Sequence, residues 1–262
     1  MRRLLAALAF SITVPAVAQD DAFMGAFNNS QQIQSNYLGS VMGSAAVAGA
    51  AANANANGAS RRTAHGTARA SAPRATTASA APASADAEKL KLPYRASPAI
   101  TTKLKQEMAR TLTKQSPQQS AAIRKFVDSG DFVAEFDKDM QSYGYALRSG
   151  DVVDAFAAYW LTMWSIANDE QQPGAAEAVA VRRQVATSMA SNPTLGNADD
   201  ATRQLVAEGL ITEAELALSL RDFATHNGRD TKPLADNTYR NLLAKGVDLR
   251  AMQLTDAGFS RR

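Results

Sequence analysis

The sequence has no cysteine among its 262 residues, which excludes disulfide bonds and metal sites built from thiolates. Packing alone must therefore stabilise the fold. Only two histidines occur, His65 and His226, and neither has a partner at the spacing of a metal-binding pair. The patterns G-x-S-x-G and G-x-G-x-x-G and the phosphate-loop pattern are also missing. We therefore expect no nucleophile elbow, no nucleotide site and no cofactor.

The larger part of the chain also lacks an excess of either charge. Residues 90–262 contain 21 Lys and Arg residues and 21 Asp and Glu residues, so their formal net charge is zero. Proteins that bind nucleic acid usually carry a basic face or a basic excess. The composition therefore predicts no nucleic-acid partner.

Long hydrophobic runs are scarce, and the one near the start is short. The chain begins with Arg2 and Arg3, followed by an apolar run over 4–14 and an A-x-A motif at 16–18. This order is typical of a secretory signal peptide, whereas a membrane-spanning helix needs about 20 apolar residues. We expect residues 1–18 to be removed, leaving no transmembrane segment and a periplasmic or secreted protein.

Residues 19–89 form an arm of low complexity, rich in Ala, Asn, Ser, Thr, Pro and Arg. Such a composition has few large side chains to offset the entropy lost on ordering, so the arm is expected to be mostly disordered. One stretch, 23–52, carries enough apolar residues for a marginal helix. Isolated helices of this kind are weak in water, so it would fold against a partner, a membrane or the main domain.

Residues 90–262 read as one all-α domain of about seven or eight helices. Pro at the first helical position, Asp caps and Gly stops recur along it. Expected helices start at Pro98, Pro117 and Asp131, and others span 151–168, 175–191, 198–225, 231–245 and, as a last short helix, 248–254. The helix over 198–225 contains Gly209, where a bend is expected. A terminal turn is expected over 255–259, and no segment shows the alternation of a β-strand.

The helix over 151–168 is the most apolar of these and holds both tryptophans. At about 100° per residue, its large side chains share one wide face, namely Phe156, Tyr159, Trp160, Met163 and Trp164. Small residues occupy the opposite face, which lets another helix approach, so we expect this helix to be central and its aromatic face to be core. The alternative is a stacking platform for a sugar or another aromatic ligand.

Carboxylate pairs are the remaining candidates for chemistry. Asp151 and Asp154 lie in the first turn of the central helix, where a cap and a negative charge near the helix N-terminus are both favourable. The alternative is a general acid/base pair near Tyr159 that hydrolyses cell-wall glycans, which requires two carboxyls about 5–10 Å apart.

Three stretches are distinctive: Leu92-Pro93-Tyr94, the run over 151–160 with Trp164 and Asn168 after it, and the ending over 246–259. Over 90–259 the chain resembles a domain-of-unknown-function family of bacterial proteins that have a signal peptide, a variable arm and one helical domain. The resemblance implies export and a helical fold. It carries no activity, and no catalytic residue follows from it.

The sequence therefore favours a non-enzymatic module of the cell envelope, structural or binding another envelope or secreted protein. The arm would be its tether or recognition element. A carboxylate-dependent glycan hydrolase is the alternative, and a membrane-surface protein docked through 23–52 is a third hypothesis.

Overall fold

The computed structural model describes residues 86–115, 118, 120–190 and 195–262. The predicted signal peptide, the marginal helix at 23–52 and almost all of the arm lie outside these ranges. Within them are seven α-helices, two 3₁₀ turns and one β-hairpin. In chain order these are η3 (Ala87–Lys89), α3 (Pro98–Gln115), α4 (Ser120–Ser129), α5 (Phe132–Ser142), α6 (Val152–Ala167), α7 (Ala175–Ala190), α8 (Asp200–His226), α9 (Lys232–Ala244), η5 (Leu249–Ala251), β1 (Met252–Thr255) and β2 (Gly258–Arg261).

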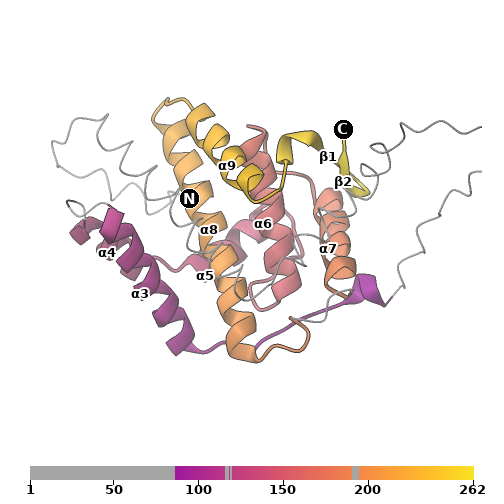
Figure 1. The fold of residues 1–262 in the computed structure, drawn as a ribbon, viewed down its shortest axis with the longest axis horizontal. Coiled ribbons are helices and arrows are strands. Elements are labelled where there is room, and N and C mark those ends of the chain that lie inside the picture. The colour runs from indigo at the N-terminus through magenta and orange to yellow at the C-terminus, as the bar shows by residue number, and fades with distance from the viewer. Residues whose placement is uncertain (1–85, 116–117, 119, 191–194) are drawn as a thin grey trace, which may run out of the picture.

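Helix α6 is the centre of the bundle, as the sequence predicts. In Figure 1 it lies between α8 and α7, and it has its most extensive contacts with these two helices and with α9. Fifteen of its sixteen residues are buried, including the small residues on the face opposite the aromatic side chains. Helices therefore cover α6 on both faces, and the predicted all-α bundle around this helix is confirmed.

Aspartates begin three of the helices. The side chain of Asp131 accepts a hydrogen bond from Ala134 N, that of Asp151 from the amides at the start of α6, and that of Asp199 from Thr202 N. Each bond satisfies a backbone donor that the first helical turn leaves without a partner. The predicted caps at Asp131 and Asp151 are confirmed.

Helix α8 crosses the domain as one continuous element of 27 residues. Gly209 lies inside it, and the helix continues through this position, where a bend was predicted. Every residue from Val206 to Leu218 is buried. Because α6, α5 and α3 all pack on α8, its acidic residues in this stretch are buried among other helices.

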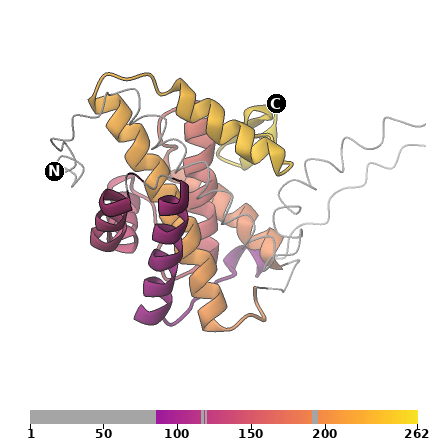
Figure 2. The ribbon, with the colours of Figure 1, turned by 60° about the vertical axis from the view of Figure 1, so that its left-hand side comes forward.

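Helices α3 and α4 form a hairpin at the edge of the bundle (Figures 1 and 2). Helix α3 packs on α8, and α4 packs on α3. Met108, Ala109 and Val127 form a small cluster of buried side chains with Phe132 of α5. Phe126 lies edge-on to Phe132, with ring centroids 5.8 Å apart. This separate cluster leaves the outer faces of both helices to solvent.

The predicted last helix over 248–254 is wrong, whereas a turn does lie within 255–259 as predicted, at Asp256 and Ala257 of a β-hairpin. Asp248 does cap a turn, but this is the single 3₁₀ turn Leu249–Ala251, and an antiparallel hairpin follows it. Thr255 pairs with Gly258, which has a φ of 96° that favours glycine. Strands of only four residues show too few alternations to be recognised in the sequence.

Side chains from α6 and α7 form hydrogen bonds with the backbone of both short strands. The Trp164 indole donates to the carbonyl of Met252 on β1 at 3.2 Å. The Gln184 amide accepts from Phe259 N at 2.7 Å and donates to Phe259 O at 2.8 Å on β2. Both edges are thereby held on the bundle, which blocks pairing with another strand at these positions. Within the described ranges, no helix is both long and apolar enough to cross a membrane.

Candidate functional site

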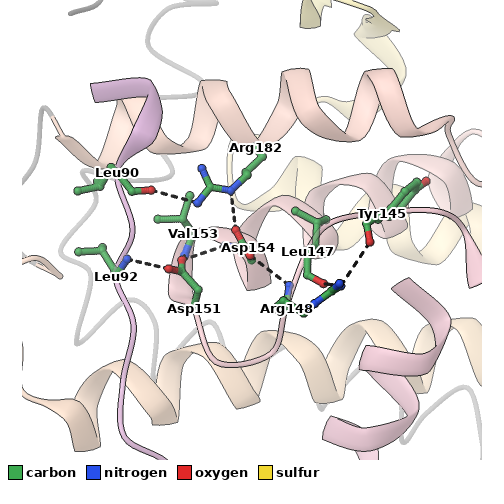
Figure 3. Close-up of polar contacts among 9 residues, drawn as sticks. All are labelled: Leu90, Leu92, Tyr145, Leu147, Arg148, Asp151, Val153, Asp154 and Arg182. Carbon is green, nitrogen blue, oxygen red and sulfur yellow. Dashed lines mark hydrogen bonds and ion pairs between the residues drawn. The ribbon is translucent and has the colours of Figure 1, made fainter. Parts of the chain in front are cut away.

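The N-terminus of α6 gathers the candidate carboxylates and the first distinctive stretch of the sequence (Figure 3). Residues 92–94 lie antiparallel to 150–152, with a bridge between Pro93 and Asp151. Val152 N donates to Leu92 O at 3.0 Å, and Tyr94 N donates to Gly150 O at 3.3 Å. The chain that enters the domain is thereby fixed against the first turn of the central helix.

Asp151 is buried, with 7% of its surface exposed. Its Oδ1 accepts from Val153 N at 2.8 Å and from Asp154 N at 3.4 Å, and its Oδ2 accepts from Leu92 N at 3.0 Å. One carboxylate thus caps α6 and also holds the entering segment. Both of its oxygens are engaged by backbone amides.

Asp154 is equally buried and pairs with arginine (Figure 3). Its Oδ1 accepts from Arg182 Nε at 2.6 Å, and its Oδ2 accepts from Arg148 N at 3.1 Å. Arg182 also donates to Leu90 O at 3.1 Å, so α7 is tied to both α6 and the entering segment. Burial raises the pKa of Asp154, the Arg182 cation opposes that rise, and the neighbouring Asp151 adds to it.

Tyr159, which the hydrolase hypothesis places near the two aspartates, is bonded elsewhere. Its hydroxyl donates to Glu213 Oε1 on α8 at 3.2 Å and is buried in the interface between α6 and α8. The structure brings Asp151 and Asp154 together on one helical turn. It directs the Tyr159 hydroxyl to a different acid.

The predicted aromatic face is largely enclosed. Phe156, Tyr159, Met163 and Trp164 are buried, whereas Trp160 is only partly buried. Trp164 lies under the C-terminal hairpin, with its ring centroid 6.2 Å from that of Phe259. Neighbouring protein groups therefore already cover the Trp164 ring, where the stacking-platform alternative would place a ligand.

The C-terminal end of α6 receives the last distinctive stretch. Asn168 caps the helix, and its side chain donates to Leu249 O at 3.3 Å. Arg250 donates to Ala167 O at 2.8 Å and to Asp236 on α9 at 2.7 Å. These bonds tie the segment after α9 to both α6 and α9.

Sequence reasoning missed a set of buried polar residues on α8. Gln204 is fully buried, and its Oε1 accepts from Ser97 N at 2.8 Å while its Nε2 donates to Ser97 O at 2.9 Å. The same amide donates to Glu208 at 2.7 Å, which is also buried. Glu213 and Glu215 are buried as well. In the sequence these acids resemble a solvent-facing helix side, and only the helices packed around α8 distinguish them from one.

The described ranges contain no group of three or more His, Cys, Asp and Glu side chains that could hold a metal ion. His226 lies in the last turn of α8, where its Nδ1 is 2.8 Å from Asp222 O. His65 lies outside the described residues.

Comparison with protein-family models identifies a match over nearly the whole chain. The model of a family described as a family of unknown function (DUF6683) matches residues 2–261. This match is wider than the resemblance over 90–259 and includes the arm. No curated protein and no solved structure match the chain.

Proposed function

The chain belongs to this family of unknown function, and from that premise we propose that it is exported and acts as a non-enzymatic, protein-binding module of the cell envelope. Export rests on the signal-peptide pattern over 1–18. Sequencing the N-terminus of protein purified from the envelope fraction tests it. The expected first residue is Gln19, and a chain that keeps residues 1–18 would contradict export by this route.

The observation that supports a non-enzymatic role is the engagement of the two candidate acids. Both oxygens of Asp151 accept hydrogen bonds from backbone amides. Those of Asp154 accept from the Arg182 guanidinium and from the backbone amide of Arg148. A general acid or base must lie within hydrogen-bond reach of a substrate atom, and both carboxyls are buried where these bonds hold them. Turning Asp151 toward a substrate would uncap α6, and turning Asp154 would detach α7 from α6.

The binding surface that we favour is the outer face of the α3–α4 hairpin. Residues 98–129 contain six Lys and Arg residues and two acidic residues, a net charge of +4 within a neutral domain. Lys103, Arg110 and Lys114 recur along one face of α3 and are exposed, and Arg124 on α4 is exposed too. An acidic protein surface would complement this face. Complementary charge raises the association rate and adds specificity.

A pull-down from envelope extract tests the proposal. The baits are the chain from Gln19 onward, the same chain without 19–89, and the Lys103→Glu/Lys114→Glu variant. Arg240→Glu is the matched control, since Arg240 is an exposed cation on α9. We expect a partner that binds the first bait and the control, and binds the double variant at least tenfold more weakly. Retention by the double variant would refute the α3–α4 surface, and no specific partner with any bait would refute the binding role.

The same preparation tests the glycan hydrolase alternative. Purified protein is incubated with peptidoglycan fragments, and soluble products are separated by chromatography. We expect none from wild type. Products from wild type that Asp154→Asn abolishes would replace the binding role with hydrolysis.

A further inference from the structure

The interface between α6 and α8 contains the carboxyl group of Glu213, and only one of its two oxygens has a hydrogen-bond partner among the described residues. Glu213 is 1% exposed, and its Oε1 accepts the hydroxyl of Tyr159 at 3.2 Å. Its Oε2 is also buried, and it has no hydrogen-bond partner among the described residues. A buried carboxylate is strongly disfavoured unless its oxygens are paired. The geometry therefore favours the protonated, neutral form.

Few charged or titratable groups act on this carboxyl. Tyr159 faces it from α6, and the cation of Lys245 acts on it from the end of α9. Helices α3 and α5 also pack on α8 and carry charged side chains, including the buried Asp139 of α5. None of these is among the groups that shift the pKa of Glu213. Glu208 and Glu215, on α8 itself, lie about 140° and 200° around the helix from Glu213, given about 100° per residue.

We propose that Glu213 is a proton-linked lock that joins α8 to α6 and to the end of α9. When the carboxyl takes up a proton, α8 and α6 pack without a buried charge. When it loses the proton, the interface holds a carboxylate whose only compensation is one hydroxyl and the Lys245 cation. This lock is independent of the proposed binding role.

The pKa of Glu213 places this loss of the proton in the neutral pH range. Burial raises this pKa from 4.5 to about 7, while the Lys245 cation and the Tyr159 hydrogen bond oppose the rise. Because the folded-state pKa is the higher one, the stabilisation is fully present below the unfolded-state value and is lost as pH rises through about 7. A shift of this size changes the folding equilibrium by a factor on the order of 100.

Urea unfolding of the full chain between pH 4.5 and 8 measures this loss. We expect the folding equilibrium constant of wild type to fall by a factor on the order of 100 more than that of Glu213→Gln, which stays neutral at every pH. Other titrating groups remain in the variant, so the difference isolates Glu213. Equal profiles for wild type and Glu213→Gln would overturn the proposal.

A second readout separates titration from a purely structural role. The Trp160 ring lies edge-on to Tyr159, with centroids 5.3 Å apart, so tryptophan fluorescence of the folded chain should report the ionisation. We expect a step near pH 7 that Glu213→Gln lacks. In Lys245→Met the step should move to higher pH, because the cation that favours the carboxylate is gone. A step that stays in place in Lys245→Met would overturn the lock even if Glu213→Gln does not fold.

Discussion

Replacing Asp151 with alanine tests whether one side chain both caps the central helix and holds the entering segment. The change removes the acceptor for Val153 N and Asp154 N, and it leaves the buried Leu92 N–H without its partner. Loss of an N-cap costs about 0.5–2 kcal/mol, and an unsatisfied buried donor costs about 1–3 kcal/mol. We expect Asp151→Ala to lose roughly 2–4 kcal/mol in the free energy of unfolding.

Asp151→Ser separates the two contributions. A serine hydroxyl can still cap α6, but one oxygen cannot also reach Leu92 N, so the loss should be about 1–3 kcal/mol. Urea unfolding followed by the fluorescence of Trp160 and Trp164 measures both variants, because both rings are on α6. Asp199→Ala, which removes an exposed cap of α8 that is bonded to Thr202, is the control and should cost less. An alanine variant that loses below about 1 kcal/mol would refute the dual role.

Three further substitutions have expected outcomes in the same unfolding assay. Trp164→Ala should cost about 3–5 kcal/mol through the cavity and the lost Met252 bond, whereas Trp160→Ala should cost clearly less because that ring is only partly buried; equal losses would contradict the difference in burial. Gly258→Ala should loosen the hairpin, since its φ is 96° and a Cβ would collide with the Gln184 amide; unchanged amide exchange at Phe259 would count against this. Gln204→Leu should lower the free energy of unfolding by about 2 kcal/mol or more, because it leaves the backbone N–H and C=O of Ser97 without their partner. An unchanged stability would show that water replaces the amide.

Local signals allowed the helical fold to be predicted. A helix start depends on one side chain and the amides two or three residues later, so Asp131 and Asp151 are recognisable without tertiary information. The central position of α6 was also predictable, because a helix that is apolar or small on all sides must be buried. These features are encoded within single helical turns.

The hairpin and the Glu213 site depend on contacts that the sequence does not display. Strands of four residues are held because Trp164 and Gln184, which are 88 and 75 residues away from their partners, pair with their edges. Glu213 is buried because three helices surround α8, although an acid in a long helix usually faces water. Trp160 shows the limit of a helical wheel, since it shares a face with Trp164 but lies near the edge of the packed region.

The three distinctive stretches of the sequence meet on one helix, and this bears on where function lies. Residues 92–94 fix the N-terminus of α6, the run over 151–160 forms its cap and first part, and the ending over 246–259 closes its C-terminal end. Their characteristic residues therefore serve capping, pairing and burial. Substituting them would lower stability first, and loss of any activity would follow unfolding. Helix α3 packs on α8 and α4 packs on α3, so their outer cations can change with little cost to the core. Separating stability from binding therefore requires substitutions on that hairpin, compared with substitutions at Asp151.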